Sequence, residues 1–430
     1  MGSFAEMLRD VDRAIDRESE WAFLLLEELV RRPSVLGSEL GAQEVLGEAL
    51  AELGFDPEYL PVPDSVANDA FSGIPTLPYT DRYNLVTGAT ESTGLPSLLV
   101  NGHIDVVPAQ ERGWTSPPFV PRRRNGWMSG RGAGDMKAGF AMVVLGLKAL
   151  RQHFAEAHSA PLRVLSVIEE ECTGNGTLAA LRAGVIADAV LLPEPTDLQI
   201  MVGGIGVTWV RVTIDLGGGH AGPSDRVSSP ADLLSSLLAS FRSLEASYNK
   251  VVEHYLETIE HPYNVNVGEV TMGDWPSSVP SLLTLGVRIG HRSDHSSEQV
   301  LQDVRACTFE ALESYGSPVK VEIVPHGFRA EGYHLDPSHA LVGALRHASA
   351  QAGNELIGTT VMGSTTDARY YINQAQIPAV CYGPVVTNMH GTDEAVELDS
   401  IVRGARTYAR LFANYIHCDG LVGFGHGLWQ

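Results

Sequence analysis

The segment Ser97-Leu98-Leu99-Val100-Asn101-Gly102-His103-Ile104-Asp105 joins a short apolar run to two polar side chains that suit a metal site. The run at its start is apolar and β-prone, so it predicts a buried strand. A histidine just past such a strand can bind a metal ion through one ring nitrogen, and Asp105 could hold the other nitrogen. A lone histidine at a strand end is more often structural, so His103 needs partners from elsewhere in the chain.

Helices and further short apolar strands surround this segment, and their alternation predicts an α/β fold with a parallel sheet. The Pro- and Gly-rich residues that precede it, up to about Arg82, are predicted to form a surface flap. The other predicted elements are helices at Phe4–Arg31, Leu40–Leu53, Met136–Leu150 and Gly176–Gly184, and strands at Leu162–Ile168 and Ala189–Leu192.

The pattern changes after residue 206, where strands begin to alternate apolar and polar residues as half-exposed strands do. The predicted order is β-α-β-β-α-β, over Val207–Ile214, Pro230–Ser247, Asn264–Thr271, Ser281–Ile289, Ser297–Ser314 and Val319–Val324. This order is typical of a separate, one-sided α+β unit of the ferredoxin-like kind. We therefore predict a discontinuous catalytic domain, 1–206 and 325–430, interrupted by an inserted domain at 207–324.

The composition is that of an ordinary globular protein, with 430 residues and a formal net charge of −22. Such an acidic chain is a poor partner for nucleic acids or anionic membranes, which favour a basic surface. Its four cysteines show no disulfide or zinc-finger spacing, and its charged N-terminus does not resemble a signal peptide. No apolar run approaches the roughly 18 residues of a membrane span. A cytoplasmic protein is expected.

A glycine-rich turn at residues 130–139 carries the second candidate ligand, Asp135. Its glycines suggest a dinucleotide-binding loop, but Asp135 occupies the third-glycine position of that motif. An acid inside a tight turn at a helix start suits a carboxylate that bridges two metal ions better than a phosphate-binding loop.

Three further segments supply acids and a second histidine. Glu169-Glu170-Glu171 follow a predicted strand, where adjacent carboxylates are costly unless a cation or a proton intervenes. Glu194 stands between two prolines after another strand, and His390 lies in the segment 388–394 before the last helix. Each segment also has a plain structural interpretation, as an exposed loop or turn.

Together these side chains fit a dinuclear site, because open α/β sheets assemble their sites at the carboxyl ends of strands. Two histidines and three carboxylates suit borderline or hard divalent ions. Two such ions can make a shared water acidic near pH 7, and a carboxylate that is not a ligand can then move the proton to a leaving amine. Zinc is the expected metal, with cobalt or manganese as alternatives.

The five motifs occur in the order found in the acetylornithine deacetylase / succinyl-diaminopimelate desuccinylase / carboxypeptidase G family, which this chain resembles over nearly its whole length. The resemblance implies a zinc-peptidase-like α/β catalytic domain with an inserted lid and dimerisation domain. It further implies that His103 and Glu194 bind one metal, that Glu171 and His390 bind the other, and that Asp135 bridges the two. The peptide bond after Asp135 would be cis.

The same resemblance assigns the remaining roles near the metals. Glu170 would be the general base and acid, and Asp105 would orient His103. Because three glutamates stand where the family motif uses two, a frame shifted by one residue is the alternative.

A glycine-rich turn in the inserted domain, residues 216–223, carries His220. In isolation His220 is a plain loop residue. In the family the matching histidine reaches the active site of the partner subunit and stabilises an oxyanion. We therefore predict a homodimer in which His220 acts in trans.

Candidate substrate anchors come from three places. Arg288 lies where the family often carries an arginine that binds a carboxylate, which suits a small anionic substrate. Arg369 lies in a segment that resembles the family's substrate loop, although it could equally form a structural ion pair with Asp367. Ser277 and Ser278 stand where many relatives have an asparagine, so Ser278 is a further candidate.

The leading functional prediction is a metal-dependent hydrolase that cleaves an amide, such as an N-acyl amino acid or a small dipeptide-like substrate. The alternative within enzymes is hydrolysis of a non-peptide C–N bond, as in a carbamoyl, amidine or aromatic amine compound. A silent binding protein predicts the loss of ligands, and all of them are present. A serine hydrolase of the α/β type would carry a GxSxG motif, which this sequence lacks.

Overall fold

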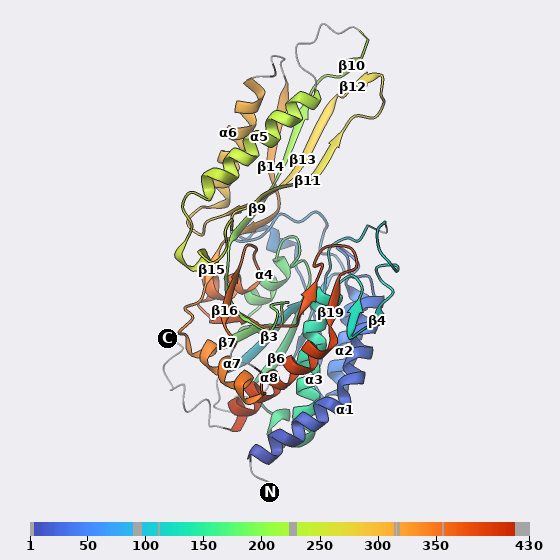
Figure 1. The fold of residues 1–430 in the computed structure, drawn as a ribbon, viewed down its shortest axis with the longest axis vertical. Coiled ribbons are helices and arrows are strands. Elements are labelled where there is room, and N and C mark those ends of the chain that lie inside the picture. Colours follow the sequence, from blue (N-terminus) through green and yellow to red (C-terminus); the bar gives the residue numbers. More distant parts are fainter. Residues whose placement is uncertain are drawn as a thin grey trace.

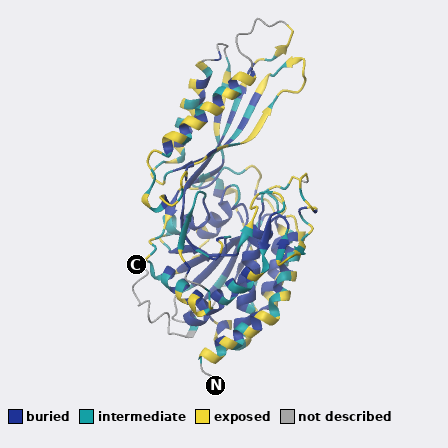
Figure 2. Ribbon diagram, in the orientation of Figure 1, coloured by how far each residue is buried: buried dark blue, intermediate teal, exposed yellow. Residues whose placement is uncertain are grey.

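The computed structural model describes residues 4–88, 97–110, 112–222, 230–313, 315, 319–354 and 357–417. Figure 1 shows a larger body that contains both ends of the described chain and a smaller, elongated unit that extends from it. Dark, buried residues fill the sheet of the larger body, whereas the far end of the smaller unit is mostly exposed (Figure 2).

A nine-stranded sheet forms the centre of the larger body. In spatial order its strands are β1 (Pro57–Pro61), β2 (Tyr83–Thr87), β6 (Leu162–Val167), β3 (Leu98–His103), β7 (Ala189–Leu192), β17 (Ala379–Cys381), β8 (Ile200–Gly204) and β15 (Tyr333–His334), with β16 (Thr359–Met362) also paired to β8. The strand that was predicted from Ser97–Val100 is β3, which lies between β6 and β7 and is buried along its length. The segment quoted first therefore runs through the middle of the sheet.

The predicted all-parallel sheet is wrong at its edges. The pairs β3–β6, β3–β7 and β17–β7 are parallel, whereas β1–β2, β2–β6 and β15–β8 are antiparallel. No α-helix connects β1 to β2, and parallel neighbours need a long crossover connection of that kind. The fold class, α/β, is confirmed.

Helices cover this sheet, and α1 to α4 lie at positions close to those predicted. They are α1 (Phe4–Arg31), α2 (Leu40–Glu52), α3 (Ala138–His153), α4 (Asn175–Arg182), α7 (Ala340–Gln351) and α8 (Leu398–His417). In α1 the apolar residues Val11, Ile15, Leu26 and Leu29 recur at helical spacing and are fully buried. Helices α1, α3 and α8 contact one another and form one helical layer.

Short helical turns complete the connections. They are η1 (Asp64–Asn68), η2 (Ala133–Lys137), η3 (Ala155–His158), η4 (His254–Leu256) and η5 (Tyr370–Ala375).

The smaller unit is a four-stranded antiparallel sheet with two helices, in the β-α-β-β-α-β order expected from the sequence. Its strand order in space is β11 (Val265–Met272), β13 (Leu282–His291), β9 (Gly206–Asp215) and β14 (Lys320–Ala330), and its helices are α5 (Pro230–Tyr248) and α6 (Ser297–Glu313). A separate hydrophobic cluster, whose residues run from Ile205 to Ala330 in the sequence, packs the helices against one face of this sheet. Strand β14 continues past residue 324, the predicted end of the insert, and the domain division itself stays a prediction.

A third sheet lies beside the helical layer, in the order β18 (Val386–Thr387), β19 (Ala395–Glu397), β5 (Trp127–Ser129) and β4 (Arg122–Arg124). Strands β19 and β5 pair directly, with Ala395 opposite Ser129. This pairing brings the segment after β5, which carries Asp135, next to the segment before β19, which carries His390.

The segment before Arg82 is not the free surface flap that its composition predicted. It contains β1 and η1, and the buried Arg82 is paired with Glu39 and Glu169. Ile74 also exchanges two backbone hydrogen bonds with Gly327 of β14, with N–O distances of 2.7 and 3.1 Å. These buried ion pairs and backbone bonds hold the segment against both sheets.

Among the described residues, none of the helices combines the length and the apolar character that crossing a membrane requires. Cys172, Cys307 and Cys381 are unpaired, and Cys418 lies outside the described residues.

Candidate metal centre

The carboxylate of Asp135 lies between two histidines that come from opposite ends of the chain. Its Oδ1 is 3.1 Å from Nε2 of His103, and its Oδ2 is 3.2 Å from Nε2 of His390. Glu194 approaches His103 on one side, at 3.8 Å, and Glu171 approaches His390 on the other, at 3.1 Å. The five predicted ligands thus form two half-sites that share Asp135.

These spacings fit metal ions held between the side chains. Tetrahedral zinc binds nitrogen and oxygen at about 2.0–2.2 Å, which separates neighbouring ligand atoms by about 3.4 Å. The four ligand–ligand distances lie between 3.1 and 3.8 Å. One ligand atom each of His103, Asp135 and Glu171 also lies within 4.8 Å of the others.

Strand β3 ends at His103, and Asp105 holds the ring of this histidine at Nδ1, on the side away from Asp135. Its Nδ1 lies 2.8 Å from the backbone oxygen of Asp105 and 3.7 Å from the Asp105 carboxylate. A proton on Nδ1 directed at an oxygen leaves Nε2 free as the ligand atom. Of Asp105, the orienting residue predicted for His103, the backbone oxygen lies closer to the ring than the carboxylate does.

The Asp105 carboxylate has a second use. It accepts hydrogen bonds from the backbone N–H groups of Glu170 and Glu171, at 3.2 and 3.1 Å. Burial raises the pKa of Asp105 to about 7. Asp105 therefore joins the end of β3 to the acidic segment after β6.

The three consecutive glutamates point to different places, which supports the predicted frame over the shifted one. Glu169 is fully buried and accepts hydrogen bonds from Arg82, Tyr79 and Thr173. Glu171 faces His390, whereas Glu170 lines the cavity beside the ligands. Glu169 is a structural residue in this arrangement.

Asp135 sits in the turn η2, and the peptide bond between Asp135 and Met136 is cis, as the family resemblance implied. Gly132, with φ +78°, allows the turn to begin. The next side chain, Lys137, is buried and donates hydrogen bonds to the backbone oxygens of Leu29 and Arg32, at 2.8 and 3.0 Å. The last carbonyl oxygens of a helix lack partners within the helix, so these two hydrogen bonds let α1 anchor the turn.

Glu194 follows β7 and is held by close backbone contacts. A side chain on Gly139 of α3 would come within 2.0 Å of the Pro193 oxygen, and one on Gly383 within 2.1 Å of the Glu194 oxygen. Only glycine at these two positions lets α3 and the chain after β17 approach the segment so closely. Packing thus adds to the stiffness that the two flanking prolines give this segment.

Glu394 is a functional residue that the sequence interpretation missed. It is fully buried and pairs with Arg131, and it accepts hydrogen bonds from the backbone N–H groups of Gly134 and Asp135 at 2.8 and 3.0 Å. Arg131 in turn donates to the backbone oxygen of His390, at 3.1 Å. This pair therefore fixes the turn of the bridging carboxylate to the loop of the second histidine. The quoted segment 388–394 contained Glu394, but no local pattern distinguishes it from its half-buried neighbour Asp393.

Glu394→Gln is expected to weaken metal binding about 10- to 100-fold, because an amide cannot accept from Arg131 and two N–H groups as a carboxylate does. Titration calorimetry of zinc into the metal-free protein measures this affinity. Glu397→Gln, on β19 and paired with Arg403 at 3.5 Å, is the matched control. Equal zinc affinities for the two variants would contradict the positioning role.

The electrostatics of the ligands favour a bound cation. Burial raises the pKa of Glu194 to about 8 and raises that of Glu170 well above its ordinary value. The carboxylate of Glu171 raises the pKa of His390 to about 11. Burial alone would also raise the pKa of Asp135, but its contacts with the two histidines hold it below its ordinary value. A site with these properties retains protons until divalent ions replace them.

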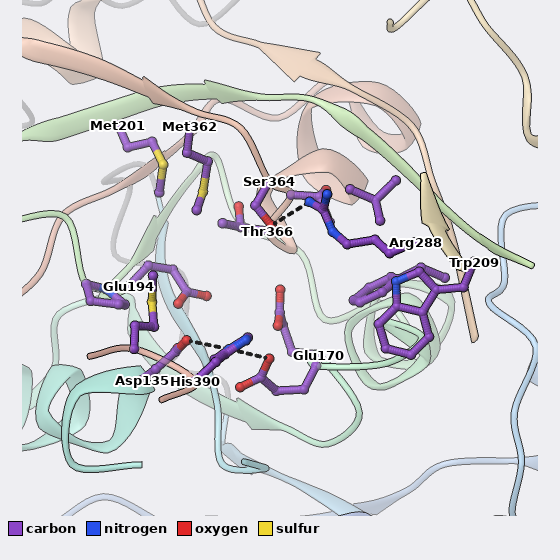
Figure 3. Close-up of a pocket in the computed structure, with 16 residues that line it drawn as sticks. Asp135, Glu170, Glu194, Met201, Trp209, Arg288, Met362, Ser364, Thr366 and His390 are labelled. Carbon is purple, nitrogen blue, oxygen red and sulfur yellow. Dashed lines mark hydrogen bonds and ion pairs between the residues drawn. The ribbon is translucent and has the colours of Figure 1, made fainter. Parts of the chain in front are cut away.

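A cavity of about 270 Å³ opens beside the ligands (Figure 3). Glu170 and Arg288 both line it, and Arg288 donates to the backbone oxygen of Gly363 at 3.2 Å. Burial lowers the pKa of Arg288, and no carboxylate of the described residues lies within ion-pair distance of it. The cavity thus contains both Glu170, which is not one of the predicted metal ligands, and Arg288, which forms no ion pair with a described residue.

Two other candidate anchors lie elsewhere in this chain. Arg369 is buried, pairs with Asp367 at 3.2 Å and stacks on Tyr370, so it fits the structural alternative rather than a substrate anchor. Ser278 is exposed on β12 (Ser278–Val279), directly opposite His220 on β10 (Gly219–His220). Both short strands lie at the far end of the smaller unit, away from the metal ligands of the same chain (Figure 1).

Comparison with known proteins agrees with this geometry. Residues 99–414 match the model of the family described as peptidase family M20/M25/M40. A succinyl-diaminopimelate desuccinylase from Psychrobacter arcticus is 26% identical over 398 residues, which cover 90% of this chain and 93% of that protein.

Two solved structures share the fold. The dipeptidase Dug1p from Saccharomyces cerevisiae superposes with a TM-score of 0.76 at 18% identity, covering 95% of this chain and 98% of that one. A Bacillus subtilis protein described as a dinuclear metal-binding peptidase gives a TM-score of 0.59 at 15% identity, covering 93% and 99%.

These findings confirm the predicted class of reaction, metal-dependent hydrolysis of an amide C–N bond. The family match spans most of the chain, and the two half-sites lie within it. The chain belongs to peptidase family M20/M25/M40.

Proposed function

We propose that this enzyme removes the acyl group from an N-acyl amino acid, or cleaves a similarly small dipeptide-like substrate. The observation that carries the proposal is the position of Glu170. It lines the cavity beside both half-sites, and its carboxylate receives no hydrogen bond from the described residues. An acid placed in this way is available to move a proton.

His103 and Glu194 would hold one divalent ion. Glu171 and His390 would hold the other ion, and Asp135 would bind both. Two ions held there would supply the charge that makes a water acidic near neutral pH. Glu170 accepts the proton of that water and then donates it to the leaving nitrogen. Zinc is the proposed metal, and cobalt or manganese suit the same donor set.

Arg288 supports a substrate with a free carboxylate. A buried guanidinium without a counter-ion binds a carboxylate through two parallel hydrogen bonds. This supports amide substrates derived from amino acids over neutral aromatic amines, which offer Arg288 no anion. Hydrolysis of a non-peptide C–N bond is therefore the weaker candidate.

The proposal is tested with N-acetyl amino acids and zinc-loaded enzyme, by measuring the release of both acetate and free amine. Equal release of the two products, lost after dialysis against a chelator and restored by zinc, is expected. Ammonia release from carbamoyl or aromatic amine compounds, with no acetate released from the acetyl compounds, would favour the non-peptide alternative. Full activity in metal-free protein would contradict the proposal.

We further propose a homodimer in which His220 acts at the partner's site. In its own chain His220 is exposed and far from the ligands (Figure 1). Its Nδ1 accepts a hydrogen bond from the backbone N–H of Gly222 at 2.9 Å, so the ring proton resides on Nε2. An Nε2–H group is a donor suited to an oxyanion.

His220→Ala is expected to lower kcat about 100-fold or more without loss of zinc, because an oxyanion donor is removed. Mixing it with Glu170→Ala subunits should restore part of the activity, since some mixed dimers contain one intact site. The mixture is compared with each variant alone after subunit exchange. Activity no greater than the sum of the two variants would contradict action in trans.

A reducing compartment, the cytoplasm, is the proposed location. It is supported by the three unpaired cysteines of the described residues. Thiol titration of freshly purified, denatured protein should find four free thiols per chain; fewer would contradict it.

A further inference from the structure

Glu169, the first of the three consecutive glutamates, is held by both its side chain and its backbone. Its carboxylate accepts hydrogen bonds from the hydroxyls of Tyr79 and Thr173, each at 2.6 Å, and pairs with Arg82. Its backbone oxygen accepts from the N–H groups of Thr173 and Gly174, at 3.0 and 2.6 Å. Glu169 does not line the cavity, so these bonds fix the chain just outside it.

The backbone of Glu169 lies in the left-handed region, with φ +64°. A residue other than glycine adopts this conformation at a cost and keeps it where its surroundings hold it there. The conformation turns the chain after β6, and the N–H groups of Glu170 and Glu171 that follow both reach the Asp105 carboxylate. The bonds to the Glu169 side chain therefore stabilise the turn that immediately precedes the proposed base.

The side chain of Glu170 has no comparable support. Among the described residues, none donates a hydrogen bond to its carboxylate, which faces the cavity (Figure 3). Its backbone N–H, in contrast, donates to Asp105 at 3.2 Å, and the carbonyl of the same peptide group belongs to Glu169. The direction of the Glu170 carboxylate therefore depends on a peptide group that Asp105 and the surroundings of Glu169 hold.

Two of the donors to Glu169 come from the segment that its composition predicted to be a flap. Tyr79 and Arg82 are 3% and 8% exposed, and each has a second partner. Arg82 also pairs with Glu39, and the Tyr79 hydroxyl accepts from Nδ2 of Asn175 at 2.8 Å. Because both donors are buried and doubly bonded, they form a stiff support behind Glu169.

We propose that Tyr79, Arg82 and Glu169 are positioning residues, which hold the carboxylate of Glu170 in place for proton transfer through the backbone that Glu169 shares with it. The inference rests on the proposed role of Glu170 as general base. A misplacement of about 1 Å can cost a reaction about 100-fold, so loosening this network lowers kcat. KM should stay unchanged, because Arg288, the proposed substrate anchor, contacts none of the three.

The first test measures kcat, KM and zinc content of Glu169→Gln with N-acetyl amino acids. An amide cannot accept from three donors as a carboxylate does, so kcat should fall about 10- to 100-fold while KM and zinc content keep their wild-type values. Asp12→Asn is the matched control, because Asp12 pairs with Arg410 between α1 and α8 at 2.5 Å. It breaks an ion pair remote from the cavity and should leave kcat unchanged. A wild-type kcat in Glu169→Gln would overturn the inference.

The second test combines Glu169→Gln with Glu170→Gln. If Glu169 acts through Glu170, the double variant should keep the kcat of Glu170→Gln alone, because the group to be positioned is already lost. A general structural role predicts a further fall by the same factor as in the wild-type background. That result would overturn the positioning role.

Tyr79→Phe keeps the test decisive if Glu169→Gln does not fold, since it removes one hydroxyl and retains the ring. The loss of one hydrogen bond should lower kcat about 3- to 10-fold with zinc content unchanged. Tyr59→Phe, at an exposed position of β1, is its control and should retain the wild-type kcat. An unchanged kcat in Tyr79→Phe would then overturn the inference.

The outcomes separate this inference from the proposed function. A Glu170→Gln enzyme with the wild-type kcat would overturn the proposed base and the positioning network together. An inactive Glu170→Gln enzyme beside a fully active Glu169→Gln enzyme would overturn the network alone and leave amide hydrolysis intact.

Discussion

Glu170→Gln is expected to lower kcat about 10²- to 10⁴-fold while the zinc content of the protein stays at the wild-type value. Glutamine has nearly the shape of glutamate but accepts no proton, so the water and the leaving nitrogen lose their proton carrier. The two half-sites do not include Glu170, because Glu171 and Glu194 supply the carboxylates beside the histidines. Steady-state kinetics and metal analysis of the same preparation measure both quantities.

The thermal stability of this variant should equal or exceed that of the wild type. Burial raises the pKa of Glu170, so its charged form is disfavoured in the folded protein and a neutral amide removes that cost. Glu322→Gln, at an exposed position of β14, is the matched control and should leave kcat unchanged. If Glu170→Gln retains more than about a tenth of the wild-type kcat, the base lies elsewhere.

Asp135→Asn is expected to reduce bound zinc from two ions per chain to one or fewer. It should also lower kcat/KM at least about 100-fold, because losing a residue that only supports a metal ligand already costs about 10- to 100-fold. Among the described residues, Asp135 is the one carboxylate that faces both histidines, at 3.1 and 3.2 Å. Asparagine offers a single neutral oxygen, and its amide group would face the other histidine as a donor. Both half-sites are therefore weakened by one substitution.

Metal analysis after equilibrium dialysis against buffered zinc measures the stoichiometry. The control is Asp10→Asn on the surface of α1, where Asp10 pairs with Arg13 at 3.1 Å. Two tightly bound ions per chain in Asp135→Asn would contradict its role as the bridge.

The ligand positions could be predicted because each depends on short local sequence. His103, Glu171 and Glu194 all follow buried strands, and parallel neighbours deliver their carboxyl ends to one edge of the sheet. The predicted helices and the order of the smaller unit follow from hydrophobic periodicity in the same way.

What could not be predicted depends on contacts between distant parts of the chain. The pairing of Glu394 with Arg131 joins residues 263 positions apart, and no periodicity marks either of them. Arg369 resembled a substrate anchor in sequence, but the fold buries it against Asp367 and Tyr370. The edge strands β1 and β15 became antiparallel through connections whose path is set by packing, not by local pattern.

The bridge between Ile74 and Gly327 attaches the smaller unit to the larger body at one point on β14. Gly327 lies against Trp209, since a side chain there would come within 2.5 Å of that ring, and Trp209 pairs with Arg288 across β9 and β13. The other end of β9, towards His220, is about 20 Å farther along the strand. Any rotation pivoting at the bridge therefore displaces Arg288 slightly and His220 through a much longer arc. Slow amide hydrogen exchange at Ile74 during turnover would show that this attachment persists, and rapid exchange there would show that it opens.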